Sequence, residues 1–174
     1  LGLGHYTDVN TPTKLDFFSK QGLRVTSIAA GGNLTLAVSE NGLAFAWPFV
    51  KSGQKYSIPV QMPFHSKIVI SRVSCGYNFG FFISIQGLVY AVGKDNSDGQ
   101  LGLGHRYPND IPEIVGCFKE AGERIDSIEC GFRHSVARST LGKVYTWGWN
   151  GHGQLGNGNF DSELSPRLIT IERA

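Results

Sequence analysis

The sequence predicts an all-β protein built from repeated units, either a β-propeller or a solenoid, and three observations support this fold class. The pentapeptide at residues 1–5 recurs letter for letter at residues 101–105. Short runs of branched and aromatic residues recur between glycines, whereas no long window keeps the apolar spacing of an amphipathic helix. Two series of glycines share spacings of 45 and 55 residues: Gly31, Gly76 and Gly131, and Gly42, Gly87 and Gly142. A repeat of about 50 residues is typical of propellers and solenoids.

The third unit shows the expected order of elements most clearly. A helical turn is expected at residues 117–122, as a connector. Residues 125–130 and 134–138 then predict two strands separated by a glycine turn, because they are short and bounded by turn residues. Residues 140–143 supply another turn, and residues 144–148 predict a third strand rich in branched and aromatic side chains.

Prolines mark the last strand of each unit, since each stands three residues before an apolar residue: Pro12, Pro59, Pro112 and Pro166. We therefore expect each unit to contribute about one four-stranded sheet. The register divides the chain into a partial unit at 1–24 and units at 25–64, 65–118 and 119–174. The chain begins inside a glycine turn and stops after a proline strand, so we expect 1–174 to be one incomplete propeller with a broken unit at each end.

Composition agrees with a glycine-rich β fold and predicts neither a nucleic acid nor a membrane as partner. Glycine contributes 23 of 174 residues, as expected where many turns need positive φ. The net charge is +2, without any run of five like charges, and there is no apolar run of 18 residues. Cys75 and Cys130 share one repeat position, which favours small buried strand residues in a reducing compartment.

Four segments together resemble a complete repeat of the regulator of chromosome condensation family: 130–137, 142–148, 153–158 and 165–169. The middle unit is similar as well, although Phe79 stands where the family usually has histidine. The first unit is the least similar, because residues 51–56 replace the Gly-Gln-Leu-Gly turn.

This resemblance implies a β-propeller, normally of about seven blades, in which the sequence unit is offset from the structural blade. Three units cannot close such a ring. We therefore expect the remaining blades to come from the same chain or from another, because an open arc leaves strand edges and sheet faces in water.

The motifs of the chain predict no catalytic, cofactor or metal site, and we expect a protein that is not an enzyme. Residues 151–156 fit the dinucleotide pattern, but turn residues follow where a helix should begin. His134 and Ser135 are adjacent on a strand, so their side chains point to opposite faces. The histidines and cysteines form no pair with zinc-ligand spacing. We expect His134 instead to donate a hydrogen bond to the backbone of a neighbouring blade.

Three functions are compatible with the resemblance. The first is a scaffold that binds protein partners through the loops at the propeller rim. The second is guanine-nucleotide exchange on a Ran-like GTPase with chromatin binding, which the family associates with a wedge insertion and a basic tail. The third is light sensing, which a plant receptor with similar repeats performs with clustered tryptophans. Gly32, Tyr77 and Phe132 occupy the matching positions here, which disfavours the third.

Residues that depart from the repeat are the best candidates for partner binding, because those that only build a blade should recur. Trp47 and Trp147 recur, with Val92 between them, and are expected to fill a slot between blades with their N–H groups paired. The candidates come from the divergent loop 48–58, from the loop 106–110 and from the position aligned with Lys94: Lys51, Lys55, Tyr56, Arg106, Tyr107 and Trp149.

The sequence thus favours a non-enzymatic scaffold inside a larger intracellular protein or assembly. A cytoplasmic or cytoskeletal setting is expected, including a ciliary or microtubule-associated role, with the nucleus as the alternative if the chain acts in nucleotide exchange.

Overall fold

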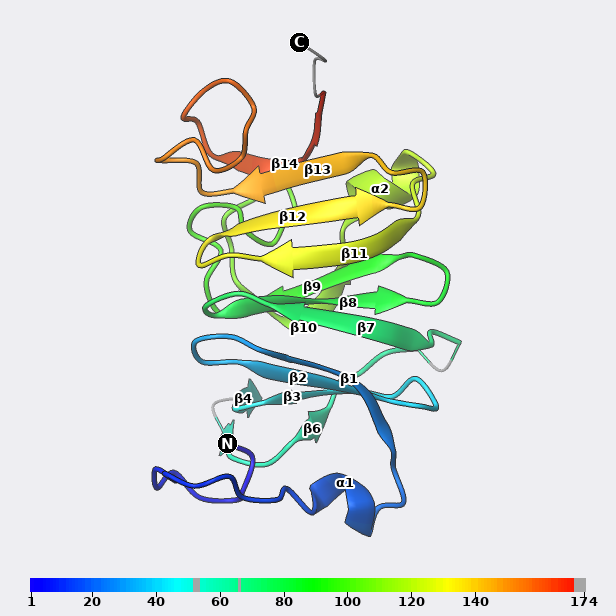
Figure 1. Ribbon diagram of the computed structural model, residues 1–174, viewed down its shortest axis with the longest axis vertical. Coiled ribbons are helices and arrows are strands. Elements are labelled where there is room, and N and C mark those ends of the chain that lie inside the picture. Colours follow the sequence, from blue (N-terminus) through cyan, green and yellow to red (C-terminus); the bar gives the residue numbers. More distant parts are fainter. Residues whose placement is uncertain (52–53, 66, 171–174) are drawn as a thin grey trace.

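The computed structural model describes residues 1–51, 54–65 and 67–170. It contains three four-stranded antiparallel sheets, stacked one on another along the long axis of the molecule (Figure 1). Each sheet is formed by strands of one repeat unit, so the expected all-β architecture of one four-stranded sheet per unit is confirmed.

The strands of each sheet have the following bounds. The first sheet has the order β1 (Val25–Ala30), β2 (Thr35–Ser39), β3 (Ala44–Trp47) and β6 (Val60–Gln61). The second has the order β7 (Ile70–Cys75), β8 (Phe79–Ser84), β9 (Val89–Gly93) and β10 (Asn109–Ile114). The third has the order β11 (Ile125–Cys130), β12 (His134–Ser139), β13 (Val144–Gly148) and β14 (Glu163–Ile169).

The hydrophobic core lies between the sheets. All residues of β8 and β9 are buried, because the first sheet covers one face of the second sheet and the third covers the other. Trp147 is fully buried, and its indole N–H donates a hydrogen bond of 2.9 Å to the carbonyl of Gln100. The expectation that this ring fills a slot between repeats and pairs its N–H group is confirmed.

The sheets come into close backbone contact at the recurring glycine after the first strand. A Cβ on Gly31 would lie 1.8 Å from the carbonyl oxygen of Gly76, and a Cβ on Gly76 would lie 2.8 Å from the carbonyl oxygen of Gly131. Both contacts are with backbone atoms, which cannot move aside as a flexible side chain can. This packing explains why glycine marks the repeat at these positions.

A short helix precedes the first strand of the first sheet and of the third sheet. The predicted connector forms α2 (Gly116–Glu120), and α1 (Phe17–Lys20) occupies the same place one hundred residues earlier. The helix α1 was not predicted, although it aligns in the repeat with the predicted turn. Phe18 and Phe118 are both buried and anchor these turns to their sheets.

The segment expected as the divergent loop 48–58 contains a small hairpin of β4 (Phe49–Lys51) and β5 (Gln54–Tyr56). The prediction of an irregular loop was therefore wrong for these residues. The alternating pattern was missed because three-residue strands are shorter than the window that reveals a period of two.

Candidate protein-interaction face

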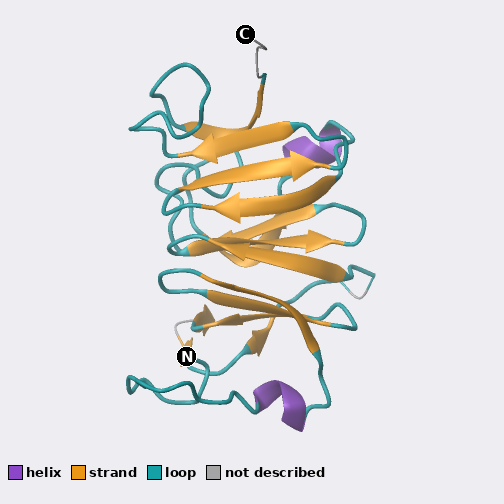
Figure 2. Ribbon diagram, in the orientation of Figure 1, coloured by secondary structure: helices purple, strands orange, loops and turns teal. Residues whose placement is uncertain are grey.

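The turns and long loops at one end of the sheets lie along one edge of the stack, which we call the loop face (Figure 2). It comprises the turns 31–34, 76–78 and 131–133, and the loops 94–108 and 149–162. Backbone hydrogen bonds join these segments, from Lys94 to Asn78 at 3.0 Å and from Trp149 to Arg133 at 2.8 Å. Antiparallel pairing places the first and third connections of every sheet at this end.

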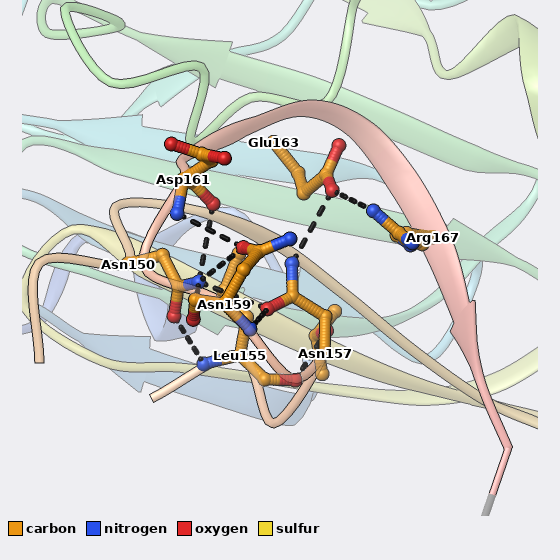
Figure 3. A network of polar contacts seen from close by, with 8 residues as sticks. Asn150, Leu155, Asn157, Asn159, Asp161, Glu163 and Arg167 are labelled. Atoms are coloured by element: carbon orange, nitrogen blue, oxygen red, sulfur yellow. Dashed lines mark hydrogen bonds and ion pairs between the residues drawn. The ribbon is translucent and has the colours of Figure 1, made fainter. Parts of the chain in front are cut away.

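A buried asparagine fixes the loop 149–162 (Figure 3). The Asn150 side chain is fully buried, and its Nδ2 donates to the carbonyls of Asn159 at 2.9 Å and Asp161 at 3.1 Å. Its Oδ1 accepts from the backbone N–H of Leu155 at 2.9 Å. One amide thus satisfies backbone groups on both arms of the loop.

Asn96 performs the same function in the loop 94–108. Its Nδ2 donates to the carbonyls of His105 at 2.8 Å and Tyr107 at 3.0 Å, and its Oδ1 accepts from the Leu101 N–H at 2.9 Å. The sequence reasoning missed both asparagines. The signal was their common repeat position, 54 residues apart, just after the third strand of each unit.

An exposed aromatic cluster lies between the second and third sheets on the loop face. The rings of Tyr77 and Phe132 are 4.5 Å apart at an interplanar angle of 34°, and they are 37% and 58% exposed. The Arg133 guanidinium lies 5.7 Å from the Phe132 ring centre and also pairs with Asp98 at 3.1 Å. The sequence reasoning missed Tyr77 and Phe132 as surface residues, because recurrence was taken to indicate a structural role.

The Asp95 carboxylate beside this cluster is held in its charged form. Burial opposes ionisation of Asp95, but hydrogen bonds from the Ser97 backbone and hydroxyl and the charge of Arg133 outweigh burial and lower the pKa. The Arg133 to Asp95 distance is 3.9 Å. The loop face therefore carries the Arg133 guanidinium between two carboxylates and next to exposed aromatic rings. This arrangement suits the binding of a partner rather than catalysis.

The predicted candidates of the long loops lie on the loop face but do not form one cluster. Tyr107 is 76% exposed, and its ring lies 5.6 Å from that of His105. Arg106 is exposed and donates a hydrogen bond to the Ser97 carbonyl. Trp149 is only half-buried and packs edge-on against His152 within its own loop, with ring centres 5.0 Å apart.

The remaining candidates belong to the hairpin. Lys51 is on β4, and Lys55 and Tyr56 are on β5. Their side chains lie outside the residues that the structure describes.

The half-buried His134 and the buried Ser135 do not form a catalytic pair. The Ser135 hydroxyl donates to the Gln100 carbonyl at 3.2 Å. The His134 ring packs over Gly131, where a Cβ would lie 2.1 Å from the ring, and burial lowers its pKa. Among the described residues the His134 ring makes no hydrogen bond. Because Ser135 faces the second sheet, His134 points to the opposite face of the third sheet, where the described chain has no further sheet, so the expected hydrogen bond to a neighbouring blade stays a prediction.

The cysteine thiols also lack the lowered pKa that a reactive cysteine needs. Cys75, Cys117 and Cys130 are free, and burial raises the pKa of the Cys130 thiol to about 12. Residues 1–51, 54–65 and 67–170 contain no group of three potential metal ligands. Neither helix in this described part of the chain is long and apolar enough to cross a membrane.

Comparison with known proteins places the chain among repeat proteins of one family. The model for the regulator of chromosome condensation (RCC1) repeat matches residues 1–38, 86–138 and 142–174, and a second model of the same repeat matches residues 70–100 and 125–154. The matched segment 86–138 runs from the second sheet into the third, so the sequence unit is offset from the sheet.

The individual relatives are longer than this chain. The ultraviolet-B receptor UVR8 of Arabidopsis thaliana is 32% identical over 97% of this chain and 39% of its own length. A mouse RCC1-like G exchanging factor-like protein is 28% identical over 98% of the chain and 39% of its own length. The crystal structure of human WBSCR16 superposes with a TM-score of 0.83 at 27% identity, covering 98% of this chain and 45% of that one.

The stacked sheets, the recurring glycines and the repeat models agree with one another over most of the chain. The chain belongs to the regulator of chromosome condensation (RCC1) repeat family, and its three sheets are blades of the β-propeller fold that this family shares.

Proposed function

We propose that the chain is part of a non-enzymatic propeller that binds a protein partner through its loop face. The observation that carries this proposal is the exposed pair of Tyr77 and Phe132, flanked by Arg133 with its two carboxylates. Aromatic residues and arginine dominate the energetics of protein interfaces. The asparagine-fixed loops support it further, since a rigid surface loses little conformational entropy on binding.

We also propose that further blades cover the open face of the first sheet. Ile28 and Ile128 occupy equivalent positions on the first strands of the first and third sheets. Ile128 is 4% exposed because the second sheet packs against it, whereas Ile28 is 73% exposed. The neighbouring Leu15, Phe18 and Trp47 line an apolar hollow on the same face. Blades of the same chain or of another one would bury this surface, as closure of a propeller requires.

The cellular setting belongs to the same proposal. Three free cysteines support an intracellular, reducing compartment. A cytoplasmic or cytoskeletal assembly, including a ciliary or microtubule-associated one, rests on the family resemblance.

A second candidate function is guanine-nucleotide exchange on a Ran-like GTPase, with a nuclear or chromatin-bound setting. The similarity to the mouse RCC1-like G exchanging factor-like protein favours it. Release of a fluorescent guanine nucleotide from purified Ran, accelerated by the full-length protein, would support exchange, and an unchanged release rate would refute it. We do not propose light sensing, because none of the positions of Gly32, Tyr77 and Phe132 carries tryptophan.

The scaffold proposal is tested with paired variants at opposite ends of the sheets. Partners are first identified by crosslinking to the full-length protein, and their direct binding is then measured with purified components. The double variant Tyr77→Ser with Phe132→Ser should weaken binding by about tenfold or more. The control is Leu141→Ser in the turn between β12 and β13, which is 77% exposed at the other end and should leave binding unchanged. Equal affinities for both variants would refute the loop face as the interface.

A further inference from the structure

A cavity of about 150 Å³ lies between the first and second sheets where they meet the loop face. Its walls include the buried Ala46 and Val92, one from each sheet. Exposed residues surround its mouth, among them Pro48, Lys94 and Asp110. The turn residues Asn33 and Asn78, joined by a side-chain hydrogen bond of 3.1 Å, complete the rim beside Tyr77.

The equivalent place between the second and third sheets is filled. The turn 98–102 of the second sheet inserts there, and Gln100 is fully buried. Its carbonyl accepts hydrogen bonds from the Trp147 indole and the Ser135 hydroxyl. A Cβ on Gly148 would lie 3.2 Å from the Cα of Gln100, so the turn lies directly against the end of β13.

Two departures from the repeat coincide at the first junction. The hairpin of β4 and β5 replaces the inserting turn in the first sheet. In the facing second sheet, Val92 replaces the tryptophan and Gly80 stands in the place of Ser135. The junction has therefore lost both the turn that fills it and the two donors that would hold a carbonyl there, which leaves an apolar hole with a polar rim.

We propose that this cavity receives one aromatic side chain of the protein partner that binds the loop face. The inference rests on the proposed scaffold function and specifies what the partner inserts. A cavity of about 150 Å³ with apolar walls is large enough for a single benzene-sized ring. An aromatic anchor in a small pocket is a common form of interface hot spot.

The polar rim favours a protein side chain over other occupants. Lys94 and Asp110 stand at the mouth with opposite charges and can pair with the backbone and neighbouring polar groups on either side of the inserted residue. The adjoining Tyr77 and Phe132 extend the contact surface beyond the cavity, since Asn33 donates its backbone N–H to the Tyr77 carbonyl at 2.9 Å. One partner segment could therefore cover both features.

The test uses the full-length protein and N-acetyl-L-phenylalaninamide as a probe of ring binding. Methyl NMR should show saturable shifts at the Val92 methyl groups on titration. Val92→Phe fills the cavity from the second sheet and Ala46→Leu fills it from the first, so either variant should abolish these shifts. Each should also weaken binding of the crosslinked partner by about tenfold. Ile85→Phe, which adds a ring at a site that is 57% exposed at the opposite end, is the matched control and should change neither measurement.

The outcomes separate this inference from the scaffold proposal. Absence of shifts at Val92 overturns the cavity as an aromatic site. If the parent protein binds the probe but Val92→Phe and Ala46→Leu both keep full affinity for the partner, the cavity does not receive a partner side chain and a small aromatic ligand is indicated instead. If the Tyr77 and Phe132 variants retain partner binding, the scaffold proposal itself fails. Ala46→Leu decides the question if Val92→Phe does not fold.

Discussion

Replacing Asn150 with alanine is the most direct test of how the loop face is held. The amide makes three well-formed hydrogen bonds to backbone groups of Leu155, Asn159 and Asp161. At about 1 kcal/mol for each hydrogen bond, the substitution should reduce the free energy of unfolding by about 3 kcal/mol. Since Asn150 is fully buried, water cannot replace the lost partners without local rearrangement.

The assay is urea denaturation followed by tryptophan fluorescence, comparing Asn150→Ala with the parent protein. Asn10→Ala is the control, because Asn10 is exposed and its removal should change stability by less than about 0.5 kcal/mol. Asn150→Asp keeps the acceptor for the Leu155 N–H group but places a buried carboxylate against the carbonyls of Asn159 and Asp161, so it should destabilise at least as much as the alanine variant. A loss below about 1 kcal/mol for Asn150→Ala would refute the argument that this amide organises the loop.

Three further predictions concern the contacts between sheets. Gly31→Ala should lower the free energy of unfolding by about 1–3 kcal/mol in urea denaturation, because the added Cβ would lie 1.8 Å from a backbone carbonyl oxygen. The control Gly116→Ala should be neutral, because its Cβ would meet only a side-chain oxygen at 3.5 Å. Equal losses in the two variants would contradict this reasoning. Trp147→Val should cost about 3 kcal/mol or more by the same assay, and a loss under 1 kcal/mol would show that the slot collapses. Burial lowers the pKa of His134 below its unfolded value of about 6.5, so the unfolded state binds the proton first and stability falls as the pH drops below that value. The melting temperature of the parent protein should therefore fall between pH 7.5 and about 5.5, and His134→Phe, which introduces the residue found at the equivalent Phe79, should make that fall smaller. An unchanged dependence of the melting temperature on pH would exclude His134 as the cause of the fall.

Much of the fold could be predicted because its signals are short-range and repeated. Turn glycines such as Gly42 and Gly142 adopt positive φ of 79°, a requirement that any single unit reveals. The slot occupied by Trp147 was predicted for the same reason, since a large ring that recurs at one register position must have a recurring place to pack.

The site was less accessible to sequence reasoning, because recurrence and exposure are different properties. Tyr77 and Phe132 recur after the repeat glycine, yet both are exposed, whereas the non-recurring Trp149 is half-buried in its own loop. Asn96 and Asn150 are polar residues in loops, and their burial follows only from the path of the chain around them.

The sequence by itself determined the repeat register, the all-β class and the expectation of many glycine turns with positive φ, because each depends on local spacing and backbone conformation. Only the tertiary structure decided that Val92, which stands at the repeat position of tryptophan, lies at the same junction as the hairpin that replaces the inserting turn of the first sheet. Those changes lie more than 35 residues apart in the chain, so their joint consequence, a cavity at the loop face, exists only once the sheets are stacked.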